Sequence, residues 1–327
     1  MISAFLSLLG LIHIDRQIKL LQYKSHSSYA GKIFDVETFF INLPLISSVN
    51  ETNFYSLITE YIATWLQTTV FGLLLYFSLT IPSYLFFFKF KKTRFLPELH
   101  GNYLIYHDIK WSTINILVEA FLVAALRMTL PRFSFIYYDV DEYGISYIFL
   151  SVLFHIVFDE TFTYWIHRFL HTYESLYLKL HIVHHRSVDI TPFAGFAFHP
   201  LDAFAQALPT FVSCHFFPIH YNVVLVFSIC TTIWAISIHD NVPMIPIKLF
   251  LYSTHHTIHH EKGYGKNRNY GKFTSVWDRL MGTYADPDRV YFGYVRNEDT
   301  KELFKKINRV IDWVVPDKTP IMRKKDN

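Results

Sequence analysis

The chain has 327 residues, of which 51% are hydrophobic and only 17% are charged, and its mean hydropathy is +0.21. Soluble domains carry about 25% charged residues, so the composition excludes a disordered chain and favours a membrane protein. A net charge of +3 without a long basic stripe argues against a nucleic-acid partner, and two cysteines are too few for a disulfide framework or a cysteine zinc site.

The first long apolar stretch predicts a membrane-spanning helix. Ala63–Phe88 contains no charged residue and exceeds the roughly 20 residues that a span needs. Basic residues follow it at once, at Lys89, Lys91, Lys92 and Arg94. This basic excess indicates that the end of the helix faces the cytoplasm. Residues 1–62 are expected to be an N-terminal region in which Met1–Ile14 dips into the membrane or lies at its interface.

Ile114–Leu130 predicts the return span. Glu119 and Arg127 lie inside it about two helical turns apart, so both should project from a similar face and point into protein. The connection Asp139–Glu142 is acidic, as expected for a turn on the non-cytoplasmic side. Residues 63–144 are therefore a predicted transmembrane hairpin.

The remaining apolar sequence predicts one further span and a helical hairpin. Ile145–Ile166 crosses back and delivers His167 to the cytoplasmic side. Phe193–Ile238 is interrupted by prolines and histidines, so it either crosses twice or dips into the membrane with its tip at Phe217–Tyr221. In both cases an even number of passes returns His239 to the side of His167.

The sequence becomes polar again from Asp286 onward. Glu298–Trp313 has the pattern of a short amphipathic helix that lies on the membrane or on the domain. Lys324 and Lys325 stand fourth and third from the end, which matches a dilysine retrieval signal of the endoplasmic reticulum. We expect a cytosolic tail over residues 286–327. The fold expected is an all-α protein with about four to five transmembrane or membrane-dipping helices.

Histidines are concentrated in one part of the chain, because 13 of the 18 lie between His167 and His260. Residues three or four apart on a helix are neighbours on one face. Three clusters have this spacing: His167 with His171; His181, His184 and His185; and His256, His259 and His260. The second and third clusters each predict a face of three imidazoles. Eight imidazoles exceed what one ion can use, so the pattern predicts two metal ions on the cytosolic face.

Other residues are candidates for the same centre. His239 and His199 are additional candidate ligands. Asp159 lies two turns before His167 on the same helical face, so it either orients imidazoles or satisfies polar groups within a buried helix. Asp240, beside His239, has the same two interpretations. Six isolated histidines are expected to be ordinary hydrogen-bonded core residues: His13, His26, His100, His107, His215 and His220.

The metal itself is less constrained than the ligands. Zinc would make a hydrolase or a structural site, because it cannot cycle electrons. A membrane site rich in imidazole and free of cysteine fits a non-haem di-iron centre that activates O2 to attack a C–H bond. Apolar helices would admit a lipid laterally, and aromatic walls suit a sterol without distinguishing it from an acyl chain.

The histidine clusters and their surroundings resemble the fatty acid hydroxylase and sterol desaturase superfamily and, within it, the sterol C5-desaturase group. The resemblance spans about residues 145–285 and rests on six stretches: Tyr164–His171, His181–His185, Thr191–Asp202, Ile233–Asp240, His256–His260 and Asn269–Arg279. The histidine clusters identify the superfamily, and Phe198–Asp202 and Trp234–Asp240 point to the C5-desaturase group. Thr191 is expected to lie near the ligands or to line the pocket.

This resemblance implies a catalytic domain over residues 145–285 in which the eight clustered histidines bind two iron ions. The implied activity is dehydrogenation of a Δ7-sterol at C5–C6, with O2 and with electrons that pass from NAD(P)H through a reductase and cytochrome b5. The chain departs from the family pattern at Phe169 and Arg186–Val188, which bears on substrate specificity. A sterol C4-methyl oxidase or another lipid hydroxylase of the superfamily is the nearest alternative. A membrane protein that binds metal without catalysis is an alternative of another class.

Overall fold

The computed structural model describes residues 54–90, 104–240, 242, 247–261, 267–287 and 298–318. The predictions for Met1–Ile14, for residues 91–94 and for the terminal lysines lie outside these ranges, as do His13, His26 and His100. The described part of the chain is mostly helical, which confirms the predicted fold class.

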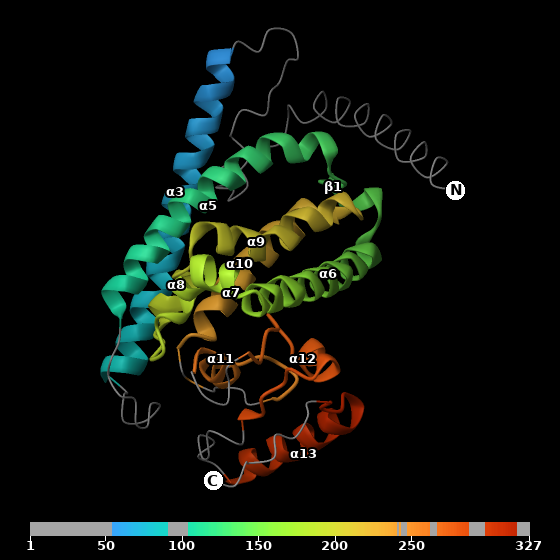
Figure 1. Cartoon of the computed structure of the whole chain (residues 1–327). Coiled ribbons are helices and arrows are strands. Elements are labelled where there is room, and N and C mark those ends of the chain that lie inside the picture. The colour runs from blue at the N-terminus through green and yellow to red at the C-terminus, as the bar shows by residue number, and fades with distance from the viewer. Residues whose placement is uncertain are drawn as a thin grey trace.

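Two long apolar helices, α3 (Phe54–Tyr84) and α5 (Ile105–Phe133), pack against each other along one side of the molecule (Figure 1). A π-helical stretch, Leu85–Phe90, prolongs α3. Leu57–Phe90 and Ile105–Leu126 are long and apolar enough to cross a membrane, so both predicted segments form helices that could span it. The second begins earlier than the predicted Ile114, because the polar side chains of Asp108 and Ser112 in its first turns are buried in protein.

The third helix with the length and composition of a span is α6 (Ile145–Thr172). It starts at the predicted residue and runs past the predicted Ile166, so that His167 lies within the helix. Glu119 is partly buried and interacts electrostatically with Lys272, as expected of a charge that points into protein. The side chain of Arg127 lies outside the described residues.

Two shorter helices, α9 (Pro200–Val212) and α10 (Tyr221–Ser237), form the predicted hairpin. Its tip carries β2 (Ile219–His220), which pairs in parallel with β1 (Ile136–Tyr137) in the connection between α5 and α6. His220 caps α10, because its Nδ1 accepts a hydrogen bond from the backbone N–H of Asn222. The tip of the hairpin is therefore tied to the end of α6 that lies away from His167.

The first histidine cluster lies at the other end of α6, and the other two lie on short helices beside it. Those helices are a π-helical turn (Tyr177–His181), α8 (Ile182–His185) and α11 (Ser253–His260), and α7 (Glu174–Leu176) connects α6 to the π-helical turn. The loops around α11 and α12 (Val276–Met281) lie below the bundle in Figure 1, with α13 (Glu298–Val314) at the bottom. Arg279 of α12 donates to Asp312 of α13 at 2.8 Å, so the predicted amphipathic helix packs on the domain.

Candidate metal centre

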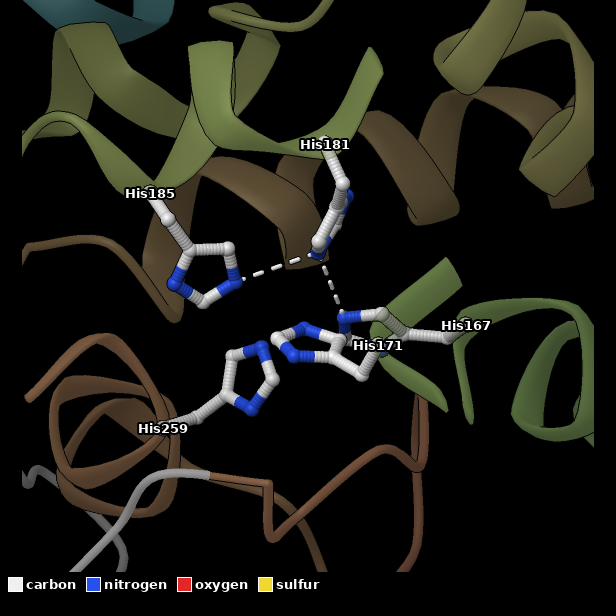
Figure 2. A group of neighbouring side chains, drawn as sticks. All are labelled: His167, His171, His181, His185 and His259. Carbon is white, nitrogen blue, oxygen red and sulfur yellow. Dashed lines mark hydrogen bonds between the residues drawn. The ribbon is translucent and has the colours of Figure 1, made fainter. Parts of the chain in front are cut away.

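Five histidines from three parts of the chain converge at the C-terminal end of α6 (Figure 2). We call them the first group: His167 and His171 from α6, His181 and His185 from the π-helical turn and α8, and His259 from α11. One ring nitrogen of each lies within 4.8 Å of those of the others. His181 Nε2 is 3.2 Å from His167 Nε2 and 3.1 Å from His185 Nε2.

Four more histidines form a second group beside the first: His184, His239, His256 and His260. The Nε2 atom of His256 is 2.8 Å from that of His239 and 3.1 Å from that of His260. His260 Nε2 is also 3.0 Å from His184 Nε2. The rings of His185 and His260 stack with their centroids 4.5 Å apart, so the two groups are in contact.

The groups do not follow the sequence clusters, and the predicted faces of three imidazoles are wrong. His181 and His185 belong to the first group, whereas His184 belongs to the second. Consecutive residues of a helix point about 100° apart, so His184 and His185 cannot face the same point. The same holds for His259 and His260. Each repeated cluster therefore supplies both groups.

The nitrogens in both groups fit the ligand set of a metal ion. A metal binds imidazole nitrogen at about 2.1 Å, so two such ligands of one ion lie about 3.0–3.4 Å apart at octahedral or tetrahedral angles. The Nε2 distances within the groups fall close to this range. The Nε2 atoms of His171 and His259 are buried and have no hydrogen-bond partner among the described residues, so they remain free to bind an ion.

The opposite ring nitrogens are held by acceptors that fix the proton. His181 Nδ1 donates to Asp202 Oδ2 at 2.7 Å, and His167 Nδ1 donates to the carbonyl of Tyr270 at 3.0 Å. His239, His259 and His260 donate from Nδ1 to the carbonyl oxygens of Ala235, Arg268 and Ser187. Because these oxygens can only accept, Nδ1 carries the proton and the lone pair of Nε2 points into the group.

Burial keeps six of the nine imidazoles neutral. Burial, reinforced by the neighbouring imidazoles, holds the pKa well below its usual range at His184, His185, His256, His259 and His260. Burial also lowers the pKa of His239 to about 4. Neutral imidazole is the form that binds a metal ion, so the site is ready to bind at cellular pH.

The segment between α11 and α12 presents two of the acceptor carbonyls, those of Arg268 and Tyr270. Asp278 accepts hydrogen bonds from the backbone N–H groups of Tyr270 at 2.8 Å and Gly271 at 2.9 Å. Glu160 of α6 accepts from the backbone N–H groups of Phe273 and Thr274, which ties the loop to that helix. The Tyr270 carbonyl that receives the His167 proton is therefore held from two sides.

Two of the other candidates make different contacts. His199 lies outside both groups and caps α9, since its Nδ1 accepts from the backbone N–H of Leu201 at 3.3 Å. Asp159 accepts from Lys272 Nζ at 2.7 Å and from Thr210 Oγ1 at 2.6 Å. These bonds favour the interpretation that Asp159 satisfies polar groups between helices.

The last two candidates, Asp240 and Thr191, are buried near the groups. Asp240 follows His239 and accepts from the backbone N–H of Val242 at 2.8 Å, and burial raises its pKa to about 8. The Thr191 hydroxyl is completely buried and has no partner among the described residues. The structure brings neither of them into hydrogen bonding with an imidazole of the groups among the described contacts.

Comparison with known proteins matches this region to a protein family. A model of the fatty acid hydroxylase family matches residues 152–283. The Delta(7)-sterol 5(6)-desaturase of Candida albicans is 32% identical over 303 residues, which cover 90% of this chain and 75% of that protein. Human lathosterol oxidase is 34% identical over 235 residues, or 70% of this chain and 76% of that protein. The chain belongs to the sterol 5(6)-desaturase family. No solved structure matches it.

Both histidine groups lie inside the region that the family model matches. The acceptors that hold the Nδ1 protons were not predicted from the sequence: the carboxylate of Asp202 and the carbonyls of Ser187, Ala235, Arg268 and Tyr270. Asp202 had a signal, because it stands in the stretch Phe198–Asp202 as a charge at the start of an apolar helix. A backbone carbonyl has no signal, since every residue carries one.

Proposed function

We propose that this chain is a Δ7-sterol 5(6)-desaturase, which introduces the C5–C6 double bond into a Δ7-sterol. One observation carries the proposal: nine histidines form two groups suited to metal ions in a chain that is 32% to 34% identical to proteins named for this activity. The ligands we propose are the nine histidines of the first and second groups, without His199.

Two iron ions bound there would supply the activation of O2 that removal of hydrogen from an unactivated C–H bond requires. The reaction takes two hydrogens from the sterol, two electrons and two protons, and reduces one O2 to two waters. The chain's own contribution is to hold the imidazoles in one tautomer, to exclude water, and to position the sterol. We place this catalytic domain at residues 145–285.

The substrate is proposed to enter from the bilayer. The helices with span-like composition expose large apolar side chains along their length, among them Leu74 on α3, Phe121 on α5 and Phe149 on α6. Such surfaces are stable against lipid and not against water. A sterol dissolved in the membrane can therefore reach the helices without crossing the aqueous phase.

The electron donors and the membrane side are part of the same proposal. The two electrons are expected from cytochrome b5 and its NAD(P)H reductase. The basic residues that follow the first span favour a cytosolic position for that end of α3. The start of α5 lies at the same end as the histidines, since Asp108 bonds to Ser187. We therefore expect the histidine groups and the tail 286–327 to face the cytosol at the endoplasmic reticulum.

The experiment is an assay in microsomes of a host that lacks its own sterol 5(6)-desaturase. Microsomes with the chain receive a Δ7-sterol, NADH and O2, and the expected product is the Δ5,7-diene, detected by its absorbance and by mass spectrometry. A product hydroxylated or carboxylated at a C4 methyl group would replace the proposal with a C4-methyl oxidase. Metal binding with neither O2 nor NADH consumption would indicate a non-catalytic metal-binding protein.

Variants of the histidines test the site within the same assay. His184→Ala and His259→Ala, one from each group, are expected to abolish diene formation while the chain still inserts into the membrane. His215→Ala is the control, because His215 lies outside both groups. Full activity of either group variant would remove that residue from the ligand set.

A further inference from the structure

Asp108 is a carboxylate buried in the first turn of α5, at the end of this helix that lies near the histidines. Its Oδ1 accepts a hydrogen bond from Ser187 Oγ at 2.5 Å and lies 3.2 Å from His107 Nδ1. A charge in an apolar helix is costly to bury, so a residue of this kind is typically retained for a specific partner.

Ser187 connects this carboxylate to the second histidine group. Its side chain donates to Asp108, and its backbone carbonyl accepts from His260 Nδ1 at 3.0 Å. The Nε2 atom of the same His260 ring lies 3.0 Å from His184 Nε2 and 3.1 Å from His256 Nε2. A shift of Ser187 would therefore turn the imidazole that contacts two other members of the group.

We propose that Asp108 is a positioning residue for the second histidine group, which acts through the Ser187 hydroxyl to hold the carbonyl that orients His260. The inference rests on the proposed metal centre. In each group a buried carboxylate then orients an imidazole: Asp202 acts directly on His181 in the first group, and Asp108 acts through Ser187 on His260 in the second. Asp108 also links the centre to α5, which lies outside the matched family region.

The same helix offers a matched control. Ser112 lies one turn after Asp108, is equally buried, and donates its hydroxyl to the carbonyl of Phe193 at 3.1 Å. That carbonyl accepts from the hydroxyls of Tyr76 and Ser112 and not from an imidazole. Ser112→Ala therefore removes a buried hydrogen bond between α5 and the same region without touching the proposed connection to His260.

The test is an anaerobic Fe(II) titration of the purified full-length chain after removal of metal, with bound iron counted per chain. The wild-type protein is expected to bind two ions. Asp108→Asn and Ser187→Ala should each lower the affinity for one of the two Fe(II) ions about tenfold. This is the lower end of the 10–100-fold losses that follow when a residue that orients a ligand is removed. Ser187→Thr, which keeps the hydroxyl, and Ser112→Ala should titrate like the wild-type protein.

The double variant decides whether the two residues act together. If Asp108 acts through Ser187, the variant that combines Asp108→Asn with Ser187→Ala should bind Fe(II) with the same affinity as the single variant that binds it less tightly. Fully additive losses, or wild-type binding of both ions by Asp108→Asn, would overturn the inference alone. A wild-type chain that binds fewer than two ions would overturn the metal centre with it. If Asp108→Asn does not fold, the difference between Ser187→Ala and Ser187→Thr decides.

Discussion

His181 Nδ1 lies 2.7 Å from Asp202 Oδ2, and both side chains are completely shielded from solvent. The carboxylate holds the ring, fixes its proton and increases the basicity of the nitrogen that faces the first group. Gln206 supports the carboxylate from the next turn of α9 by donating to its other oxygen at 2.8 Å. The pair joins α9 to the histidine centre.

Asp202→Asn is expected to lower metal affinity and desaturase activity about 10–100-fold, because the amide carries no charge and its oxygen is a weaker acceptor. Bound iron per chain and diene formation measure the two effects. Leu201→Met is the control, since Leu201 is the neighbouring residue and is exposed. Wild-type iron content in Asp202→Asn would show that the carboxylate does not tune the ligand.

His239→Ala and His199→Ala should behave differently although both residues flank the clusters in sequence. His239 Nε2 is 2.8 Å from His256 Nε2, so its loss should remove iron from the second group. His199 caps α9, and loss of a cap costs about 1 kcal/mol of stability without removing a ligand. Iron analysis and thermal unfolding of the two variants separate these effects. Iron loss in His199→Ala would contradict the proposed ligand set.

Gly271→Ala is expected to damage the centre from outside it. A Cβ atom at this position would meet the carbonyl oxygen of Thr274 and lie 2.5 Å from Leu251 Cδ1. The loop must then shift and move the Tyr270 carbonyl from His167, so activity and melting temperature should both fall.

Gly144→Ala is the contrasting variant. Gly144 has a φ of +78°, but nothing lies within 4 Å of a Cβ added there. The substitution should lower the free energy of unfolding by about 1–2 kcal/mol, because alanine must adopt a left-handed backbone conformation there. Diene formation should be retained. Equal loss of activity in both glycine variants would argue against a specific role for the loop.

Lys272→Met should destabilise the protein strongly. It removes the cation 2.7 Å from the buried carboxylate of Asp159 and leaves that charge with the Thr210 hydroxyl. Breaking one partner of a buried pair costs about 3–5 kcal/mol, which should lower the melting temperature in detergent. Lys272→Met combined with Asp159→Asn should recover part of the loss, because the carboxylate that lost its cation is then replaced by a neutral amide. No recovery would mean that the two groups are not coupled.

Stability should depend on pH through Asp278. Burial raises the pKa of this carboxyl from 3.8 to about 7. The folded chain then binds the proton more tightly than the unfolded chain, so this contribution favours folding below pH 4 and is lost as the pH rises to about 7. Asp278→Asn lacks the titration, and its melting temperature should fall less than that of the wild-type protein between pH 4 and 7. If the melting temperatures of the two proteins change in parallel with pH, the pKa of Asp278 is not raised in the folded chain.

The spans and the clustered histidines were predictable from the sequence because both depend on local periodicity. The length of an apolar run indicates α3 and α6, and the spacing of four indicates that His167 and His171 share a face. The proximity of His239 to the clusters was also predictable, since counting passes placed it at the same end of the bundle as His167, and His239 does join the histidine centre.

The division into two groups was not predictable, because it depends on how α8 and α11 face each other across the molecule. His184 and His185 differ by one helical step, and only the packing decides which group each joins. The early start of α5 was missed for a similar reason. Asp108 lowers the hydropathy of that turn, and its partner Ser187 lies 79 residues away.

All eight residues of α11, Ser253–His260, are buried, and four of them are histidines. So short a helix is not stable in isolation, and enclosing so many imidazoles offers little hydrophobic gain. If the groups hold iron as proposed, much of the free energy that keeps α11 in place comes from the ions. Iron would then be needed while the chain matures, and not only when it turns over substrate. In a cell short of iron we expect chains whose helical bundle is inserted in the bilayer and whose C-terminal third is not folded. Such chains should be degraded.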